Sequence, residues 1–263
     1  MAVALLFLCF LVLATTTSDA VIAHSDPQII QLLRPRAGVA GHPDSEINCL
    51  SWRLAVETNN IRNWDLVPET CEDYVGNYML GKQYRLDCEA VADIAIEYAE
   101  NLTIPDDGKS IWVFDIDETA FSNLPYYARP SVGFGAKKYN STAFGEYIQE
   151  ADVPALPASL RLYRNLVKLG IKSVFLTGSS ERYREAREEN LKKVGYYTWE
   201  KLILKPISEK GTSSVYFKSK ERTKLVNEGY RIVGNIGDQW SDIIGTNVGN
   251  RTFKLPDPMY YVG

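Results

Sequence analysis

Strand-like and helix-like segments alternate through the second half of this chain. Four short apolar runs are predicted as strands: 110–115, 171–178, 201–206 and 230–238. Three segments with helical periodicity separate them: 159–170, 180–195 and 218–229. Strands that alternate with helices favour a parallel sheet with helices on both faces. We therefore expect a Rossmann-like α/β core over 109–263.

The segment 46–108 has mostly helical signals. In YRLDCEAVADIAIEYAENL, Leu86, Ala90 and Ile94 lie close to helical spacing, with acidic residues between them. We expect this helical segment to pack on the core or to cap it. The preceding residues, 21–45, contain scattered prolines and no period, which predicts an extended or flexible lead-in.

The chain begins with an apolar stretch, MAVALLFLCFLVLATTTSDA. We interpret residues 1–20 as a secretory signal peptide cleaved near Ala20 or Ala23, although no Lys or Arg precedes the apolar core. The alternative is a membrane anchor, but the apolar core is too short to span a bilayer. We therefore expect an extracellular or vacuolar protein that is free of the membrane after cleavage.

Export changes the interpretation of the cysteines. Cys9 leaves with the signal peptide, and Cys49, Cys71 and Cys88 remain. An odd number in an oxidising compartment indicates one disulfide and one thiol. We favour Cys49–Cys71, because both residues lie before the core and flank a helical stretch. The sequence alone leaves the pairing open.

Three N-x-S/T motifs are candidate glycosylation sites: Asn101, Asn140 and Asn250. Each asparagine would lie on the surface if it were glycosylated. Such short motifs also arise by chance, and about half of them are unused.

Charge and composition exclude several classes of protein. The net charge of −4 gives no basic surface for nucleic acid. The two histidines, His24 and His42, both precede the core. This argues against a histidine phosphatase, a Ser-His-Asp hydrolase and a dinuclear metal site of the purple phosphatase type. No cysteine is followed by the arginine spacing of a cysteine phosphatase.

The segment WVFDIDETAFSN, 112–123, places Asp115, Asp117 and Glu118 at the end of a predicted strand. Like charges repel one another, and burial also disfavours the charged form. An isolated D-x-D is ordinarily a solvated acidic turn. However, ligands of open α/β sheets bind at the carboxyl ends of the strands, so a cation among these acids is the alternative.

Polar groups from the other strands should reach the same edge. They are Thr177, Asp238, Asp242 and either Lys218 or Lys220. Carboxylate oxygens are the ligands that Mg²⁺ prefers. A threonine hydroxyl and a lysine can bind phosphate oxygens, while one carboxylate attacks phosphorus and another moves a proton.

The motif Asp115-Ile-Asp117-Glu118-Thr119, followed by Asn123, resembles the first motif of the haloacid dehalogenase (HAD) superfamily of phosphatases. It is similar to the D-x-D-E-T form of secreted acid phosphatases, and in particular to the plant acid phosphatase and vegetative storage protein family. The resemblance covers roughly 46–263 and includes CLSWRLAVETNN, VPETCEDYVGNYM, ENLKKVGYYTWEKLIL and GYRIVGNIGDQWSDI. It implies a HAD-like fold and a Mg²⁺-dependent acid phosphatase that hydrolyses small phosphate monoesters.

The resemblance also implies roles for the acids. Asp115 would form an aspartyl-phosphate, and Asp117 would protonate the leaving alcohol and then activate water. Mg²⁺ would be held by the Asp115 carboxylate, the Asp117 backbone carbonyl and the Asp238 carboxylate. Asp242 would support the metal shell or the lysine. Glu118 receives only a supporting role in shaping the turn.

The phosphate would be bound by Thr177, Gly178 and a lysine. We choose Lys218, which lies twelve residues before Tyr230 of the following strand, and keep two alternatives, Lys220 and Lys210. Many relatives have Thr-Gly-Arg at the second motif, whereas this chain has Thr-Gly-Ser at 177–179. Arg182 and Arg184 lie nearby.

Aromatic residues are the candidates for the substrate entrance. Tyr126, Tyr127 and Phe134 follow the acidic motif and are equally suited to lining the entrance or to packing.

Two alternative functions remain. One is a storage protein with weak or no phosphatase activity, which a Ser or Asn at 115 would favour, but Asp115 is present. The other is a D-x-D glycosyltransferase, which predicts neither the lysine nor the GDQWSD motif. The resemblance alone points to a homodimer.

Overall fold

The computed structural model describes residues 47–262. The predicted signal peptide (1–20), its cleavage positions and the predicted lead-in (21–45) lie outside these residues. In the described part, no helix is both long and apolar enough to cross a membrane.

The core is a five-stranded parallel sheet with the order β3-β2-β1-β4-β5. Its strands are β1 (Ser110–Phe114), β2 (Lys172–Ser180), β3 (Lys201–Lys205), β4 (Arg231–Gly237) and β5 (Thr252–Lys254). The predicted α/β fold with a parallel sheet is confirmed. The edge strand β5 was not expected, because three residues with one buried side chain, Phe253, show no period.

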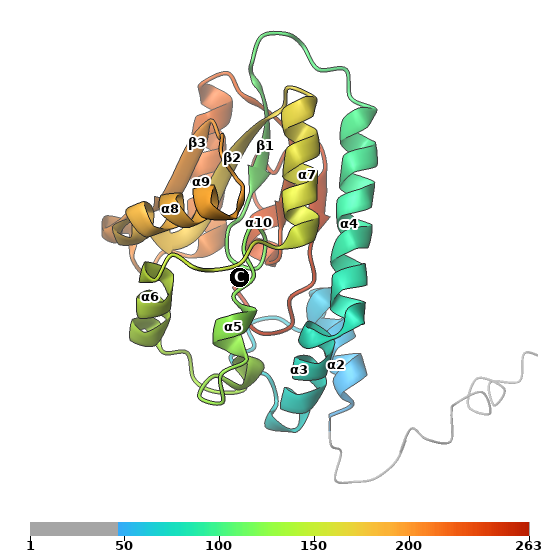
Figure 1. Cartoon of the computed structure of the whole chain (residues 1–263), viewed down its shortest axis with the longest axis vertical. Coiled ribbons are helices and arrows are strands. Elements are labelled where there is room, and N and C mark those ends of the chain that lie inside the picture. Colours follow the sequence, from blue (N-terminus) through green and yellow to red (C-terminus); the bar gives the residue numbers. More distant parts are fainter. Residues whose placement is uncertain (1–46, 263) are drawn as a thin grey trace, which may run out of the picture. The chain divides into compact units, whose positions relative to one another are not determined.

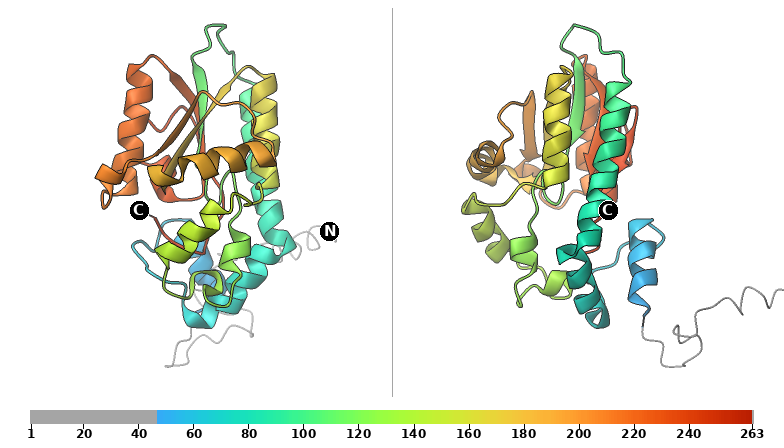
Figure 2. Two further views of the ribbon diagram at one scale, coloured as in Figure 1. Left: turned by 60° about the vertical axis from the view of Figure 1, so that its left-hand side comes forward. Right: turned by 45° about the vertical axis from the view of Figure 1, so that its right-hand side comes forward.

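Helices cover both faces of the sheet (Figure 1), as Figure 2 shows from two other sides. The long helices α4 (Lys82–Glu100) and α7 (Pro157–Lys168) pack together on one face, and α9 (Ser214–Asn227) lies on the other. The central strand β1 is buried along its whole length. Its Trp112 and Phe114 pack in the core of the α4 and α7 face, whereas Ile111 and Val113 pack with residues of α9.

The shorter helices lie mainly beyond the carboxyl ends of the strands (Figure 1). They are α2 (Cys49–Glu57), α3 (Glu72–Leu80), α5 (Leu124–Tyr127), α6 (Ser141–Gln149), α8 (Arg184–Val194) and α10 (Trp240–Ile243). α5 and α6 belong to the connection between β1 and β2. The carboxyl ends of the strands, where the acidic residues lie, are therefore covered by helices that precede β1 in the chain and by helices that follow it.

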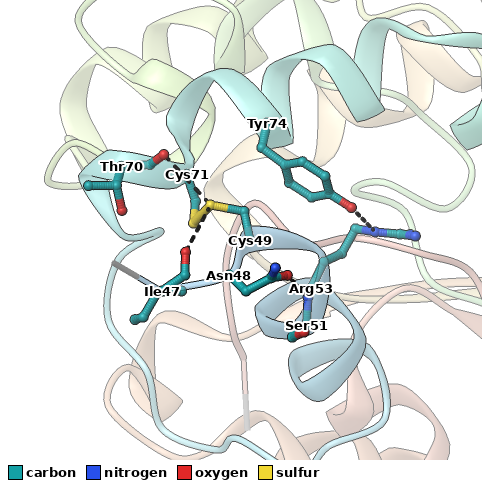
Figure 3. Close-up of a disulfide and its surroundings, with 8 residues drawn as sticks. All are labelled: Ile47, Asn48, Cys49, Ser51, Arg53, Thr70, Cys71 and Tyr74. Carbon is teal, nitrogen blue, oxygen red and sulfur yellow. Dashed lines mark hydrogen bonds between the residues drawn. A yellow bond between two sulfur atoms is a disulfide. The ribbon is translucent and has the colours of Figure 1, made fainter. Parts of the chain in front are cut away.

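A disulfide joins the first two of these helical segments (Figure 3). It links Cys49, at the start of α2, to Cys71, the last residue of a 3-10 helix directly before α3. This is the pairing favoured from the sequence, and Cys88 is a buried free thiol. The two cysteines are separated by 22 positions, and closing such a loop stabilises a fold by about 3 kcal/mol.

The asparagines of the three N-x-S/T motifs are all exposed. Asn101 donates its side-chain amide to the carbonyl of Glu97 at the end of α4. Asn140 caps α6 by accepting from two backbone N–H groups. Their exposure is compatible with glycosylation, which remains a prediction.

Candidate active site

Asp115 directly follows the central strand and lies in a buried charge cluster. Its backbone N–H donates to the carbonyl of Ile236 at 3.1 Å, so the residue extends the pairing of β1 with β4. Lys218, on the buried face of α9, donates to Asp115 Oδ1 at 2.6 Å and also to Asp242 Oδ1. A single ammonium group therefore bridges a carboxylate at the end of β1 and a carboxylate of α10, the helix that follows β4.

The alternative lysines lie elsewhere. Lys220 pairs with Glu209 and lies 3.9 Å from Glu221. Lys210 is exposed. Of the three candidate lysines, the structure brings only Lys218 to Asp115.

Three carboxylates form a candidate metal centre. Asp115, Asp238 and Asp242 each place one oxygen within 4.8 Å of the others, and all three residues are buried. Asp238 is held by the Thr119 hydroxyl at 3.0 Å and by the Gln239 amide at 2.8 Å. Asp242 accepts the Gln239 backbone N–H at 2.9 Å, so it also caps α10. The arrangement keeps the oxygens together without help from bulk water.

The electrostatics of this cluster favour a cation. Burial, and then the charge of Asp242, raise the pKa of Asp238 to about 8. Burial also raises the pKa of Asp115 well above its ordinary range, and the Lys218 charge only partly opposes this. Burial disfavours the charge of Lys218 too, but Asp115 and Asp242 outweigh it and raise the lysine pKa. Buried oxygen ligands with excess negative charge fit a divalent ion such as Mg²⁺.

Asp117 lies outside this cluster. Its Oδ1 accepts from Arg187 Nη2 at 2.6 Å and from Asn123 Nδ2 at 3.0 Å. Its carboxylate is not among the three clustered ones. If Asp117 contributes to a metal site, the contribution comes from its backbone carbonyl, as the resemblance implies.

Arg187 was not predicted from the sequence as a site residue. It lies on the buried face of α8, in the series Tyr183, Arg187, Asn190 and Leu191, all of which are buried. The spacing is that of a core-facing helical stripe. A charged residue in such a stripe was the available signal, because arginine is rarely buried unless it is paired.

Glu118 shapes the turn through its side chain. It has a left-handed backbone with φ of 53° and is fully buried. Its carboxylate accepts the Asn123 backbone N–H at 2.6 Å, Asn123 Nδ2 at 2.9 Å and the Tyr260 hydroxyl at 2.9 Å. Burial, and then the charge of Asp117, raise the Glu118 pKa to about 7. Glu118 thus fixes the asparagine that contacts Asp117.

The end of β2 supplies polar groups opposite Asp115. Thr177, Gly178, Ser179 and Lys218 line the same cavity as Asp115. The Thr177 hydroxyl oxygen accepts the Ser179 backbone N–H at 3.0 Å, which leaves the hydroxyl hydrogen available for a ligand. This geometry suits the binding of a phosphate oxygen.

A cavity of about 520 Å³ opens above these residues. Its wall is rich in aromatic side chains: Trp64, Tyr127, Tyr139, Phe144, Tyr183, Tyr260 and Tyr261. Tyr127 stacks on Tyr260, with ring centroids 5.4 Å apart. Tyr126 and Phe134, the other proposed entrance residues, are not part of the wall. The C-terminal segment, which the sequence did not connect with the site, therefore forms one side of it.

Comparisons with known proteins identify the family and the fold. Residues 37–263 match the family model described as HAD superfamily, subfamily IIIB (Acid phosphatase). Acid phosphatase 1 of Solanum lycopersicum is 44% identical over 232 residues, which cover 87% of this chain and 90% of the relative. Vegetative storage protein 1 of Arabidopsis thaliana is 41% identical over 265 residues, covering 96% of both chains.

Solved structures show the same fold. The class C acid phosphatase from Bacillus anthracis superposes with a TM-score of 0.56 and 21% identity, covering 72% of this chain and 85% of that one. At this identity the likeness concerns the fold alone. The match to the family model and the plant relatives establish the family. The chain belongs to the acid phosphatase family of the HAD superfamily, subfamily IIIB.

Proposed function

We propose that this chain is a Mg²⁺-dependent acid phosphatase that hydrolyses small phosphate monoesters through an aspartyl-phosphate. The main support is the Lys218 ammonium group, which contacts both Asp115 and Asp242. Lys218 and Asp115 both line the cavity. Phosphate monoesters hydrolyse extremely slowly in water, so positioned cations and a nucleophile are the required elements.

In the first step, an oxygen of Asp115 attacks phosphorus while the bond from phosphorus to the ester oxygen breaks. Asp117 gives its proton to the departing oxygen, which leaves as an alcohol. Lys218 and the Thr177 hydroxyl hold the phosphate oxygens, on which negative charge is spread.

In the second step, a water oxygen bonds to phosphorus while Asp117 takes the proton of that water. The bond between phosphorus and Asp115 breaks, and the carboxylate is restored together with free phosphate.

The metal would be held by the Asp115 and Asp238 carboxylates and the Asp117 carbonyl, with Asp242 in support. When bound, the divalent cation would offset the repulsion between the acids and a dianionic ester.

The proposed location is extracellular or vacuolar. The support is the apolar N-terminal stretch, the disulfide and the exposed N-x-S/T asparagines. A relative from Glycine max, 46% identical over 219 residues, is named Stem 28 kDa glycoprotein. Glycosylation of this chain at Asn101, Asn140 or Asn250 follows as a further expectation.

The test is release of phosphate from an aryl phosphate with Mg²⁺ at acidic pH. We expect clear turnover by the wild type and a loss of at least about 1,000-fold in Asp115→Asn, because the nucleophile is removed. Asp106→Asn is the matched control, since this exposed carboxylate precedes β1 at the opposite end of the strand. Its activity should equal that of the wild type.

A storage role is the second candidate, because a relative covering nearly the whole chain is named a vegetative storage protein. The presence of Asp115 favours the enzyme. Absence of wild-type turnover at every acidic pH with added metal would support storage instead.

A further inference from the structure

We propose that Arg187 is a positioning residue for the phosphatase reaction. It holds the Asp117 carboxylate by Oδ1, so that Oδ2 is the atom that gives and takes the proton. This inference rests on the proposed function and adds to it a residue outside the acidic motifs.

Two donors converge on the same oxygen of Asp117. Arg187 Nη2 lies 2.6 Å from Oδ1, and Asn123 Nδ2 lies 3.0 Å from it. Within residues 47–262, Oδ2 accepts no hydrogen bond from the protein. Asp117 lines the cavity, and its side chain is 18% exposed. The unbound oxygen is therefore the one available to a ligand.

Both donors approach from fixed positions. Arg187 belongs to α8, and its side chain is 1% exposed. Asn123 precedes α5 and is held by Glu118, which in turn accepts the Tyr260 hydroxyl. Rotation of the Asp117 carboxylate would break hydrogen bonds from two separate elements. The orientation is thus set before substrate arrives.

The buried guanidinium is poorly explained by stability alone. In the described part of the chain, Arg187 Nε and Nη1 have no hydrogen-bond partner, and the group lies 5.6 Å from the centre of the Phe121 ring. Asp117 is the acidic residue with which it pairs. An apolar side chain of similar size would often be at least as stable in place of a buried ion pair. The carboxylate that Arg187 orients accounts for its presence.

The arrangement suits both halves of the reaction. When Asp117 carries a proton on Oδ2, Oδ1 remains a carbonyl-type acceptor for Arg187 and Asn123. The proton moves from Oδ2 to the ester oxygen as the bond from that oxygen to phosphorus breaks. In the second half, water transfers a proton to Oδ2 as its oxygen bonds to phosphorus and Asp115 is released. The two hydrogen bonds to Oδ1 need not change.

The experiment compares substrates with different leaving groups. A nitrophenolate leaves with little help from an acid, whereas an alkoxide requires a proton. For Arg187→Met, we expect kcat/KM, which reports the steps up to departure of the leaving group, to fall about 100-fold on an alkyl phosphate and about fivefold on nitrophenyl phosphate. Arg187→Lys should recover part of the loss. Arg184→Met removes an arginine at the start of α8 that pairs with Glu181 and does not line the cavity, so its activity should match that of the wild type.

A double variant separates positioning from general damage. If Arg187 acts through Asp117, then Asp117→Asn with Arg187→Met should be no slower than Asp117→Asn alone. Equal losses of kcat/KM on both substrates would overturn the inference while leaving the proposed function intact. A double variant clearly slower than Asp117→Asn alone would do the same. If Arg187→Met does not fold, Arg187→Lys decides by the same leaving-group comparison. A wild type without turnover would overturn the proposed function and this inference together.

Discussion

Asp115 and Asp117 are two residues apart, yet their surroundings differ in kind. Asp115 is 6% exposed and faces an ammonium group and two further acids. Asp117 is paired with a guanidinium group and an amide, and one of its oxygens is open to the cavity. The comparison teaches that two aspartates of one motif can have different environments, which is what the proposed roles of nucleophile and proton carrier require.

The backbone creates this separation. Asp115 still pairs with β4 through its N–H group, whereas the N–H groups of Thr119 and Phe121 both return to the carbonyl of Ile116. The left-handed Glu118 lies within this tight turn. Residues that would point to one side of a strand are therefore directed to two different sets of partners.

The largest expected effect on activity comes from the surroundings of Asp115. Lys218→Met should lower kcat by about 100-fold or more, because it removes the cation beside Asp115, the proposed nucleophile, and beside the proposed phosphate site. Lys220→Met is the matched control on the same helix and should retain activity. Activity at the wild-type level in Lys218→Met would show that the ammonium group is not needed.

Replacement of Asp117 should instead have its clearest effect on the stability of the fold. Asp117→Asn leaves Arg187 buried without a carboxylate, so the free energy of unfolding should fall by about 3 kcal/mol. Asp115→Asn should cost clearly less in metal-free protein, because it also removes repulsion with Asp238 and Asp242. Urea unfolding of both variants measures the difference, and equal costs would contradict this contrast.

Protonation of buried acids near Asp115 and Asp117 should have a smaller effect on stability. Burial first, and neighbouring acids second, raise the pKa of Glu118 to about 7 and that of Asp238 to about 8. The folded state then binds more protons than the unfolded state between roughly pH 4.5 and 8, so metal-free stability should fall as pH rises through this range.

Mg²⁺ should flatten this dependence, since it replaces protons among the acids. Urea unfolding at about pH 5 and about pH 8, with chelator or with Mg²⁺, measures the change. Glu118→Gln should weaken the pH dependence without abolishing it. A metal-free protein that becomes more stable toward pH 8 would contradict the assigned shifts.

The smallest expected effect concerns Thr177. Thr177→Val removes an uncharged hydroxyl and should lower kcat/KM about tenfold, which corresponds to one hydrogen bond to phosphate. Thr177→Ser should restore most of the activity. A loss as large as that of Lys218→Met would mean that the hydroxyl has a role beyond binding.

Much of the fold followed from local patterns. The four longer strands and the helices between them have clear periodicity, and parallel topology follows from their alternation. The strand β5 was not predicted, because its three residues are too few to show a period. Arg187 and Tyr260 were not predicted as site residues, because each lies far in sequence from the acid it contacts. Arg187 is 70 residues from Asp117, and Tyr260 is 142 residues from Glu118.

The sequence by itself determined the fold class, the family resemblance and the acids at the end of β1, because these depend on local composition and spacing. Tertiary structure decided which lysine contacts Asp115, which acids cluster and which partners fix Asp117. These are distances between side chains on separate elements, and only packing brings such elements together. The turn after β1 illustrates both contributions: its motif was visible in the sequence, but the direction of each carboxylate was not.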